Sequence, residues 1–126
     1  MKICDLKNSG GYLYHGSPFK IDILKPSQAY NFNKDKNKMI EDGKPAVSAT
    51  QYLNIAIFRA LVNKENAPEN HWSEFGVDGG EINLITSKEV LDQIKLKKGY
   101  LHVLDEDGFT KYNGMEWRSY AEVKPL

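Results

Sequence analysis

The stretch Tyr12-Leu13-Tyr14-His15-Gly16-Ser17 is an aromatic and aliphatic run that changes abruptly to small and polar residues. Short runs of this composition are typical of a buried strand. Pro18 follows directly, and Gly, Ser and Pro in succession favour a turn. We therefore predict a buried strand over 12–15 that is closed by a turn and has His15 at its end.

A second such stretch lies near the other end of the chain, where the sequence reads Tyr112-Asn113-Gly114-Met115-Glu116-Trp117-Arg118-Ser119-Tyr120. We predict that the last strand begins at Glu116 and runs to Val123, because Pro125 ends it. His15 and Glu116 are the side chains of the two stretches best able to do chemistry. Only the tertiary fold can bring them together.

Between these ends, the clearest pattern predicts a helix over Gln51–Lys64, with Thr50 as its N-cap. Apolar residues recur there on one broad face. That face comprises Leu53, Ala56, Ile57, Ala60 and Leu61.

Shorter patterns fill the rest of the chain. They predict strands at Pro45–Ala49, Glu81–Ile85 and Gly99–Leu104, and a short helix at Ser87–Lys95 capped by Ser87. We interpret Ser27–Lys44 as a long polar connection that acts as a mobile lid, and Glu69–Gly80 as a loop. Mostly strands with one main helix indicate an α+β fold, in two small sheets or one bent sheet.

Composition sets further limits. The chain has 126 residues, 40% hydrophobic and 27% charged, which fits a single domain over 1–126. A net charge of zero argues against a uniformly basic surface for nucleic acid. The single cysteine, Cys4, excludes an internal disulfide and a cysteine-based zinc site, and no histidine has metal-ligand spacing to a partner. We expect no metal, no membrane segment and a cytoplasmic location.

Three segments, taken in order, resemble a known family. The run ending in His15-Gly16-Ser17 looks like the first motif of the poly(ADP-ribose) polymerase branch of the ADP-ribosyltransferases, the His-Tyr-Glu type. Ala46–Thr50 and the helix after it look like the second motif, a strand leading into a helix with a stacking aromatic residue. The strand that presents Glu116 looks like the third motif, which carries the catalytic glutamate.

The resemblance implies a fold and an activity. The fold would be the small split β-sandwich of ADP-ribosyltransferases, with an NAD cleft between the sheets. The activity would be cleavage of the nicotinamide–ribose bond of NAD and transfer of ADP-ribose to an acceptor, either protein or nucleic acid. Water as the acceptor would make the chain an NAD glycohydrolase, and this alternative stays open.

The resemblance also implies roles for single residues. Glu116 would be catalytic, stabilising the positive charge that develops on the ribose. His15 would fix the pose of NAD through a ribose hydroxyl. The backbone of Gly16 would contact the nicotinamide amide, and Ser17 its ribose. Phe58 would stack on nicotinamide, with Tyr52 as the alternative.

The chain departs from the family pattern at three positions. Ile55 replaces a serine that often binds the nicotinamide amide, and Phe58 replaces the stacking tyrosine. Arginine-specific members carry an acidic residue two positions before the glutamate. Gly114 stands there instead, so modification of arginine is not supported.

Other interpretations stay open for the same residues. His15 fits a core histidine, Glu116 a solvated charge at a strand edge, Phe58 a packing residue, and Ser17 the start of a turn. Lys34, Lys36 and Lys38 fit a solvated loop or a contact with nucleic acid or acceptor. An RNA 2′-phosphotransferase on the same fold is another alternative. Such an enzyme needs several basic residues around the phosphate, and the sequence shows no matching set. A non-catalytic module that binds NAD or ADP-ribose is the remaining alternative.

Overall fold

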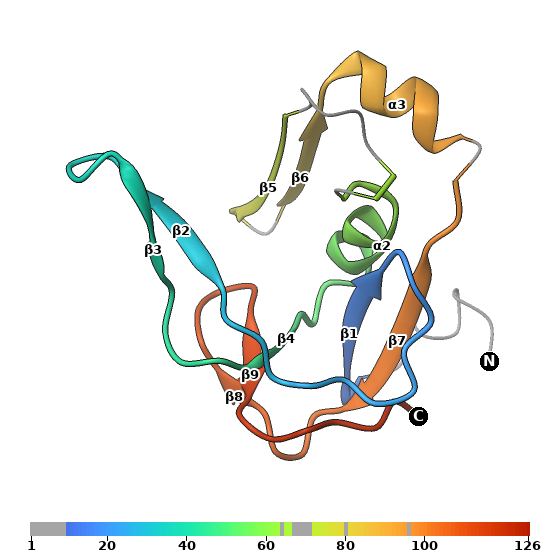
Figure 1. Ribbon diagram of the computed structural model, residues 1–126. Coiled ribbons are helices and arrows are strands. Elements are labelled where there is room, and N and C mark those ends of the chain that lie inside the picture. Colours follow the sequence, from blue (N-terminus) through green and yellow to red (C-terminus); the bar gives the residue numbers. More distant parts are fainter. Residues whose placement is uncertain (1–9, 64, 67–71, 80, 96) are drawn as a thin grey trace.

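The computed structural model describes residues 10–63, 65–66, 72–79, 81–95 and 97–126 (Figure 1). Within these ranges the chain is a mixed α+β structure with short strands in small sheets and two helices. The predicted α+β class is therefore confirmed. The strands are β1 (Tyr12–Ser17), β2 (Tyr30–Asn33), β3 (Lys38–Glu41), β4 (Val47–Ala49), β5 (Ser73–Asp78), β6 (Glu81–Thr86), β7 (Tyr100–Asp105), β8 (Thr110–Lys111) and β9 (Trp117–Ser119). The helices are α2 (Leu53–Leu61) and α3 (Lys88–Ile94).

The strands at the two ends of the chain meet through β4. Strand β1 pairs antiparallel with β7, and β4 pairs antiparallel with β9, which also pairs with β8. Tyr14 of β1 and Thr50 exchange two backbone hydrogen bonds of 2.8 and 2.9 Å. This bridge places β4 beside β1, so the two terminal stretches identified in the sequence become near neighbours (Figure 1).

Helix α2 packs directly on β1. Tyr14 forms a buried cluster with Leu53 and Ala56 of the helix. A Cβ atom at Gly16 would overlap the backbone carbonyl of Ala56. Glycine at this position therefore permits the close approach of helix and strand. Ile55, which departs from the family pattern, is 1% exposed and belongs to the core.

A second apolar cluster lies between the two strand pairs. It joins β1, β4 and β7 with two connecting segments, and Ile21, Trp117 and Val123 pack against it. Its buried members are Leu13, Leu24, Val47, Ala49, Leu104 and Phe109. Burial of these side chains is the main stabilising contribution that holds the strand pairs in place.

The predicted boundaries of the main helix are wrong at both ends. The helix begins at Leu53 and not at Gln51, with Tyr52 at the N-cap position. Thr50 does not cap it, because its Oγ1 accepts a hydrogen bond from the Tyr52 amide in a tight turn before the helix. Val62 is already extended and ends the helix.

Two segments predicted to be loops contain strands. The connection Ser27–Lys44 contains β2 and β3, and the loop Glu69–Gly80 contains β5. Most residues of the β2–β3 hairpin are exposed, and the alternation of Tyr30 and Phe32 with asparagines covers only four residues, so the sequence shows no clear strand pattern. Its turn is closed by local contacts instead: the Asn33 side chain accepts from the Lys36 amide, and Asn37 has a φ of 50°.

The last strand is also shorter than predicted, because β9 covers Trp117–Ser119 within the range from Glu116 to Val123. The short helix α3 is confirmed, although the Ser87 hydroxyl makes no capping hydrogen bond. Among the described residues, no helix has the length and apolar character needed to span a bilayer.

The contact at Gly16 generates a stability prediction. Gly16→Ala is expected to lower the free energy of unfolding by about 3 kcal/mol, because its methyl group must displace helix backbone. Gly76→Ala is a matched control in β5, where an added Cβ meets nothing within 4 Å. Urea unfolding followed by circular dichroism measures both. Equal stability of the two variants would contradict the packing explanation for Gly16.

Candidate active site

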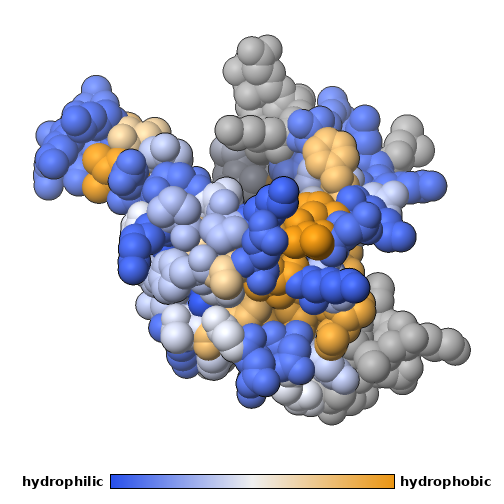
Figure 2. Space-filling model, turned by 60° about the horizontal axis from the view of Figure 1, so that its bottom comes forward, coloured by the Kyte–Doolittle hydropathy of each residue, from blue (hydrophilic) through white to orange (hydrophobic). Residues whose placement is uncertain are grey.

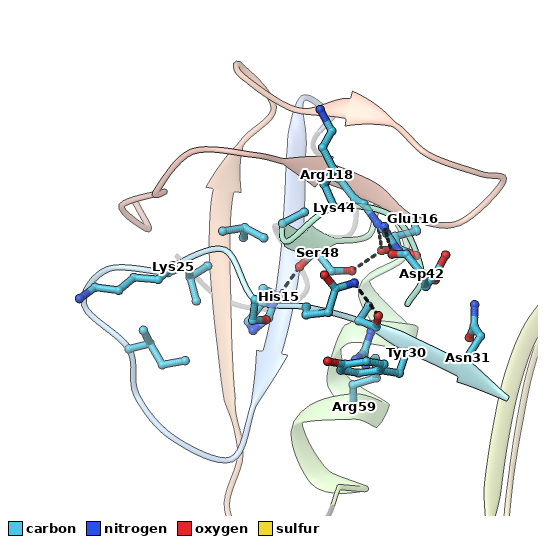
Figure 3. A pocket seen from close by; sticks show the side chains of 17 residues that line it. His15, Lys25, Tyr30, Asn31, Asp42, Lys44, Ser48, Arg59, Glu116 and Arg118 are labelled. Carbon is cyan, nitrogen blue, oxygen red and sulfur yellow. Dashed lines mark hydrogen bonds and ion pairs between the residues drawn. The ribbon is translucent and has the colours of Figure 1, made fainter. Parts of the chain in front are cut away.

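His15 and Glu116 are held to the same residue, Ser48 of β4 (Figure 3). The Nδ1 atom of His15 lies 2.7 Å from the Ser48 carbonyl oxygen. The Ser48 hydroxyl donates to Oε2 of Glu116 at 2.9 Å. His15 comes from the segment that resembles the first motif, Glu116 from the third, and Ser48 from the second. The pairing of β4 with both β1 and β9 creates this arrangement.

The hydrogen bond to Ser48 fixes the tautomer of His15. A carbonyl oxygen only accepts, so Nδ1 carries the proton and Nε2 keeps its lone pair. Nε2 makes no hydrogen bond with a described residue. Burial lowers the pKa of His15, and the charge of Arg59 lowers it further, although the Ser48 carbonyl opposes the change. The imidazole is therefore neutral at pH 7 and offers an acceptor.

Glu116 is oriented by two donors on one oxygen. Arg118 Nε donates to Oε2 at 2.7 Å, and the Ser48 hydroxyl donates to the same atom. Within the part of the chain that the structure describes, Oε1 has no hydrogen-bond partner. One oxygen of the carboxylate is therefore fixed, while the other is available for a ligand.

Arg118 is the buried centre of the site, with 2% of its side chain exposed. Besides Glu116, its guanidinium binds Asp42 twice, at the backbone carbonyl (2.7 Å) and at Oδ2 (3.0 Å). The Tyr112 ring lies 3.5 Å from it, and the Tyr112 hydroxyl donates to Asp42 Oδ1 at 2.7 Å. Glycine is required at position 43 for two reasons. A Cβ there would lie 2.6 Å from the guanidinium, and the φ of +74° is a conformation that other residues rarely adopt.

The charges in this network reinforce one another. Burial alone lowers the pKa of Arg118, but the hydrogen bond and charge of Glu116 and the charge of Asp42 raise it above its ordinary value. The pKa of Asp42 is lowered, first by the hydrogen bond from Tyr112 and also by Arg118. Asp42 and Glu116 each keep 22% exposure. Their negative charges balance the charge of the buried guanidinium, and both carboxylates still reach solvent.

A polar depression opens beside these residues. It comprises two adjoining cavities of about 460 and 360 Å³, and His15, Ser48, Arg59 and Glu116 line both. This size is typical of small-molecule sites. Arg59 projects from α2 and makes no ion pair with a described acidic side chain. Desolvation lowers its pKa and the charge of Glu116 opposes this, although part of the side chain remains exposed.

Further basic groups lie around the larger cavity. Lys25 and Lys44 line it together with Arg59 and Arg118, whereas its acids, Asp42 and Glu116, are both paired with Arg118. The cavity therefore has an excess of positive charge that favours an anionic ligand. In Figure 3, Asp42, Glu116 and Arg118 lie close together, whereas the Lys25 side chain extends away from them.

His102 does not line these cavities but binds the backbone of His15. Its Nδ1 donates to the His15 carbonyl at 3.1 Å, and its Nε2 accepts from the Ile21 amide at 3.0 Å. The rings of His102 and His15 are 5.8 Å apart. His102 is 6% exposed and holds the end of β1 in place.

Of the other predicted site residues, Gly16 lines this depression, whereas Ser17, Tyr52 and Phe58 do not. Gly16 lines the smaller cavity, but its missing side chain faces α2. Ser17 is buried, and its hydroxyl accepts from the Phe19 amide in a turn. Tyr52 lines a different cavity, beside Gly11 and Trp117.

Phe58 is half-buried and packs edge-on against Phe75, with ring centres 6.2 Å apart. Phe75, which belongs to β5, lines the smaller cavity, whereas Phe58 does not line it. The segment of Phe75 was predicted to be a loop, so it offered no reason to choose this ring over Phe58.

Several residues of the site were not predicted from the sequence. Ser48 and Arg118 lie inside the segments that matched the second and third motifs, and Arg118 follows Glu116 by two residues in the predicted last strand. That spacing places both side chains on the same face and was a usable signal. Asp42 lies in the segment predicted to be a connection, and no local pattern marks it.

Among the described residues, no group of three or more His, Cys, Asp or Glu side chains is arranged to hold a metal ion. His71 lies outside the described residues. No protein-family model, curated protein or solved structure matches the chain. Inferences about function therefore depend on the site itself.

The depressed pKa of His15 predicts how stability changes with pH. The unfolded chain binds the proton more tightly than the folded one, since the folded pKa lies below the unfolded value of 6.5. Stability is therefore fully present above pH 6.5 and decreases as the pH falls toward the lower folded pKa.

Urea unfolding of wild type and His15→Asn at about pH 7.5 and 5.5 tests this expectation. The asparagine amide can still donate to the Ser48 carbonyl but does not titrate. Wild type is expected to lose more stability than the variant between the two pH values. An equal loss in both proteins would show that His15 is not responsible.

Proposed function

We propose that the protein is an NAD-dependent ADP-ribosyltransferase with the split β-sandwich fold of that superfamily. One observation supports this above the others. His15 and Glu116, taken from the first and third motifs, are bound to the same serine of the second motif and line the same cavities. The three motifs must meet in this way if they form one active site.

The residues present fit a dinucleotide. The two adjoining cavities are large enough for a ligand with two ends, and both are reached by His15 and Glu116. Arg59, Lys25 and Lys44 suit the pyrophosphate, because cationic side chains bind phosphate oxygens through charge-assisted hydrogen bonds. Phe75 presents a ring to the smaller cavity, and a ring of this kind suits a flat heterocycle.

NAD supplies an N-glycosidic bond whose electron pair leaves with nicotinamide, while an electron pair of the acceptor forms the new bond to ribose C1′. Glu116 stabilises the positive charge that develops on the ribose, and its free Oε1 binds a ribose hydroxyl or takes the acceptor's proton. Arg118 and Ser48 hold Oε2 and so prevent the carboxylate from turning away.

His15 acts by orientation. Its neutral Nε2 accepts a hydrogen bond from a ribose hydroxyl, while Nδ1–H remains bound to Ser48. Protonation would convert the acceptor into a donor, so binding weakens in acid. We assign the stacking contact to Phe75, with Phe58 supporting it at its edge.

Glu116→Gln tests the proposal, because the amide can still accept from Ser48 and Arg118 but carries no charge. Release of nicotinamide from NAD, followed by proton NMR, is expected to fall by about a hundredfold or more. NAD affinity, measured by calorimetry, should change much less. Glu122→Gln is the control, since Glu122 is exposed and lies outside both cavities. Full activity of Glu116→Gln would overturn the catalytic assignment.

An RNA 2′-phosphotransferase is the second candidate, and the basic set of the larger cavity favours it. The sequence showed no such set, yet Lys25, Lys44, Arg59 and His15 surround one cavity. Incubation with NAD and an RNA oligonucleotide carrying an internal 2′-phosphate separates the two candidates. We expect the RNA to keep its phosphate. Loss of the phosphate, unaffected by Glu116→Gln, would favour the phosphotransferase.

A further inference from the structure

The β2–β3 hairpin projects from the body of the molecule (Figure 1). It begins beside the larger cavity. Tyr30 and Asn31, at its base, line that cavity together with Glu116. Beyond them the hairpin extends into solvent, and Figure 2 shows its hydrophilic end with hydrophobic side chains beside it. No role in the chemistry above requires this arm.

One face of the hairpin carries exposed apolar rings. Phe32 is opposite Met39 in the antiparallel register, and Tyr30 lies two residues before Phe32 on the same face. Tyr30, Phe32 and Met39 are 54%, 56% and 56% exposed. Three large apolar side chains together on a projecting arm indicate a surface that binds a partner.

The chemistry of the tip identifies the class of partner. Lys34, Lys36 and Lys38 surround a single acid, Asp35, and all four are exposed. Aromatic rings beside lysines on a strand pair are the combination by which proteins bind single-stranded nucleic acid, with bases on the rings and phosphates on the cations. A purely apolar partner would leave the lysines without a role.

The spacing of the rings agrees with this partner. Residues two apart in a strand are about 6.8 Å apart, which is about twice the 3.4 Å between nucleotides in one strand of a duplex. The rings of Tyr30 and Phe32 therefore suit neighbouring bases of an extended, unstacked strand. A duplex offers no exposed base faces to such an arm.

The base of the hairpin is firmly joined to the site. Asp42 directly follows β3, and its backbone amide donates to the Ala29 carbonyl just before β2. The same residue binds Arg118 through its carbonyl and its carboxylate, and Arg118 binds Glu116. A strand held on the arm is therefore kept in a fixed relation to Glu116.

We propose that the β2–β3 hairpin binds single-stranded nucleic acid and presents it to the cavity as the acceptor of ADP-ribose. The proposal rests on the function proposed above, and the transfer is the step written there. A nucleophilic group of the nucleic acid forms the bond to ribose C1′, nicotinamide leaves with the electron pair of the old bond, and the acceptor's proton passes to Glu116.

The first test measures binding alone, without NAD. Fluorescence anisotropy follows a labelled single strand of about 12 nucleotides, as DNA and as RNA. Three phosphate contacts predict a log–log salt slope of about −2, so affinity should fall about 15-fold from 50 to 200 mM salt. The nucleic acid that binds more tightly, DNA or RNA, is the expected acceptor.

Two hairpin variants localise the binding. Phe32→Ala is expected to weaken it by about 5- to 100-fold through loss of one stacked base. Replacement of Lys34, Lys36 and Lys38 by Gln is expected to bring the salt slope close to zero. All four side chains are exposed, so thermal unfolding should be unchanged.

Matched controls lie elsewhere on the surface. The first replaces another group of exposed lysines, Lys95, Lys97 and Lys98, by Gln, and the second is Tyr100→Ala, in β7. Both are expected to bind the oligonucleotide as wild type does. Equal losses in the control and hairpin variants would overturn the proposal.

Failure of this inference can be distinguished from failure of the proposed function. Glu116→Gln should bind the oligonucleotide normally but release nicotinamide about a hundredfold more slowly. The hairpin variants should bind the oligonucleotide weakly but, without it, release nicotinamide as wild type does. Wild type that releases nicotinamide but binds no oligonucleotide overturns this inference alone. Binding to phosphatidylserine vesicles in preference to the oligonucleotide would also overturn it.

Discussion

The ion pairs of Arg118 are the constraint on which the rest of the site depends. A guanidinium with 2% exposure is costly to bury unless its donors are satisfied and its charge is neutralised. Two carboxylates and one backbone carbonyl meet both needs here. Because these partners come from both sides of the site, the charge cannot be buried unless the surrounding segments are in place.

This requirement links three parts of the fold. Glu116 connects Arg118 to Ser48 and so to β4, while Asp42 connects it to the end of β3. Gly43 makes room for the guanidinium where a side chain would collide with it. Buried charges of this kind add little net stability, but they restrict the arrangements that the chain can adopt. In this chain the restriction sets both the orientation of Glu116 and the origin of the β2–β3 hairpin.

The comparison of sequence and structure separates local from distant effects. The strand at Tyr12, the main helix and the strand at Tyr100 were predictable, because each buries a face whose period is visible over a few residues. The hairpin at Tyr30 and the strand at Ser73 were not, since these short and mostly exposed strands bury no continuous face. These strands are stabilised by the strands with which they pair, and a local sequence pattern does not show which strands will pair.

The sequence by itself determined the kinds of chemistry available: a histidine at the end of a buried strand and a glutamate before another. The tertiary structure alone decided which residues meet. The contacts from Ser48 to His15 and Glu116 join positions 33 and 68 residues apart, and the contact from Arg118 to Asp42 spans 76. Such contacts depend on the lateral order of strands. That order is set by burial of the whole core, which no short segment encodes.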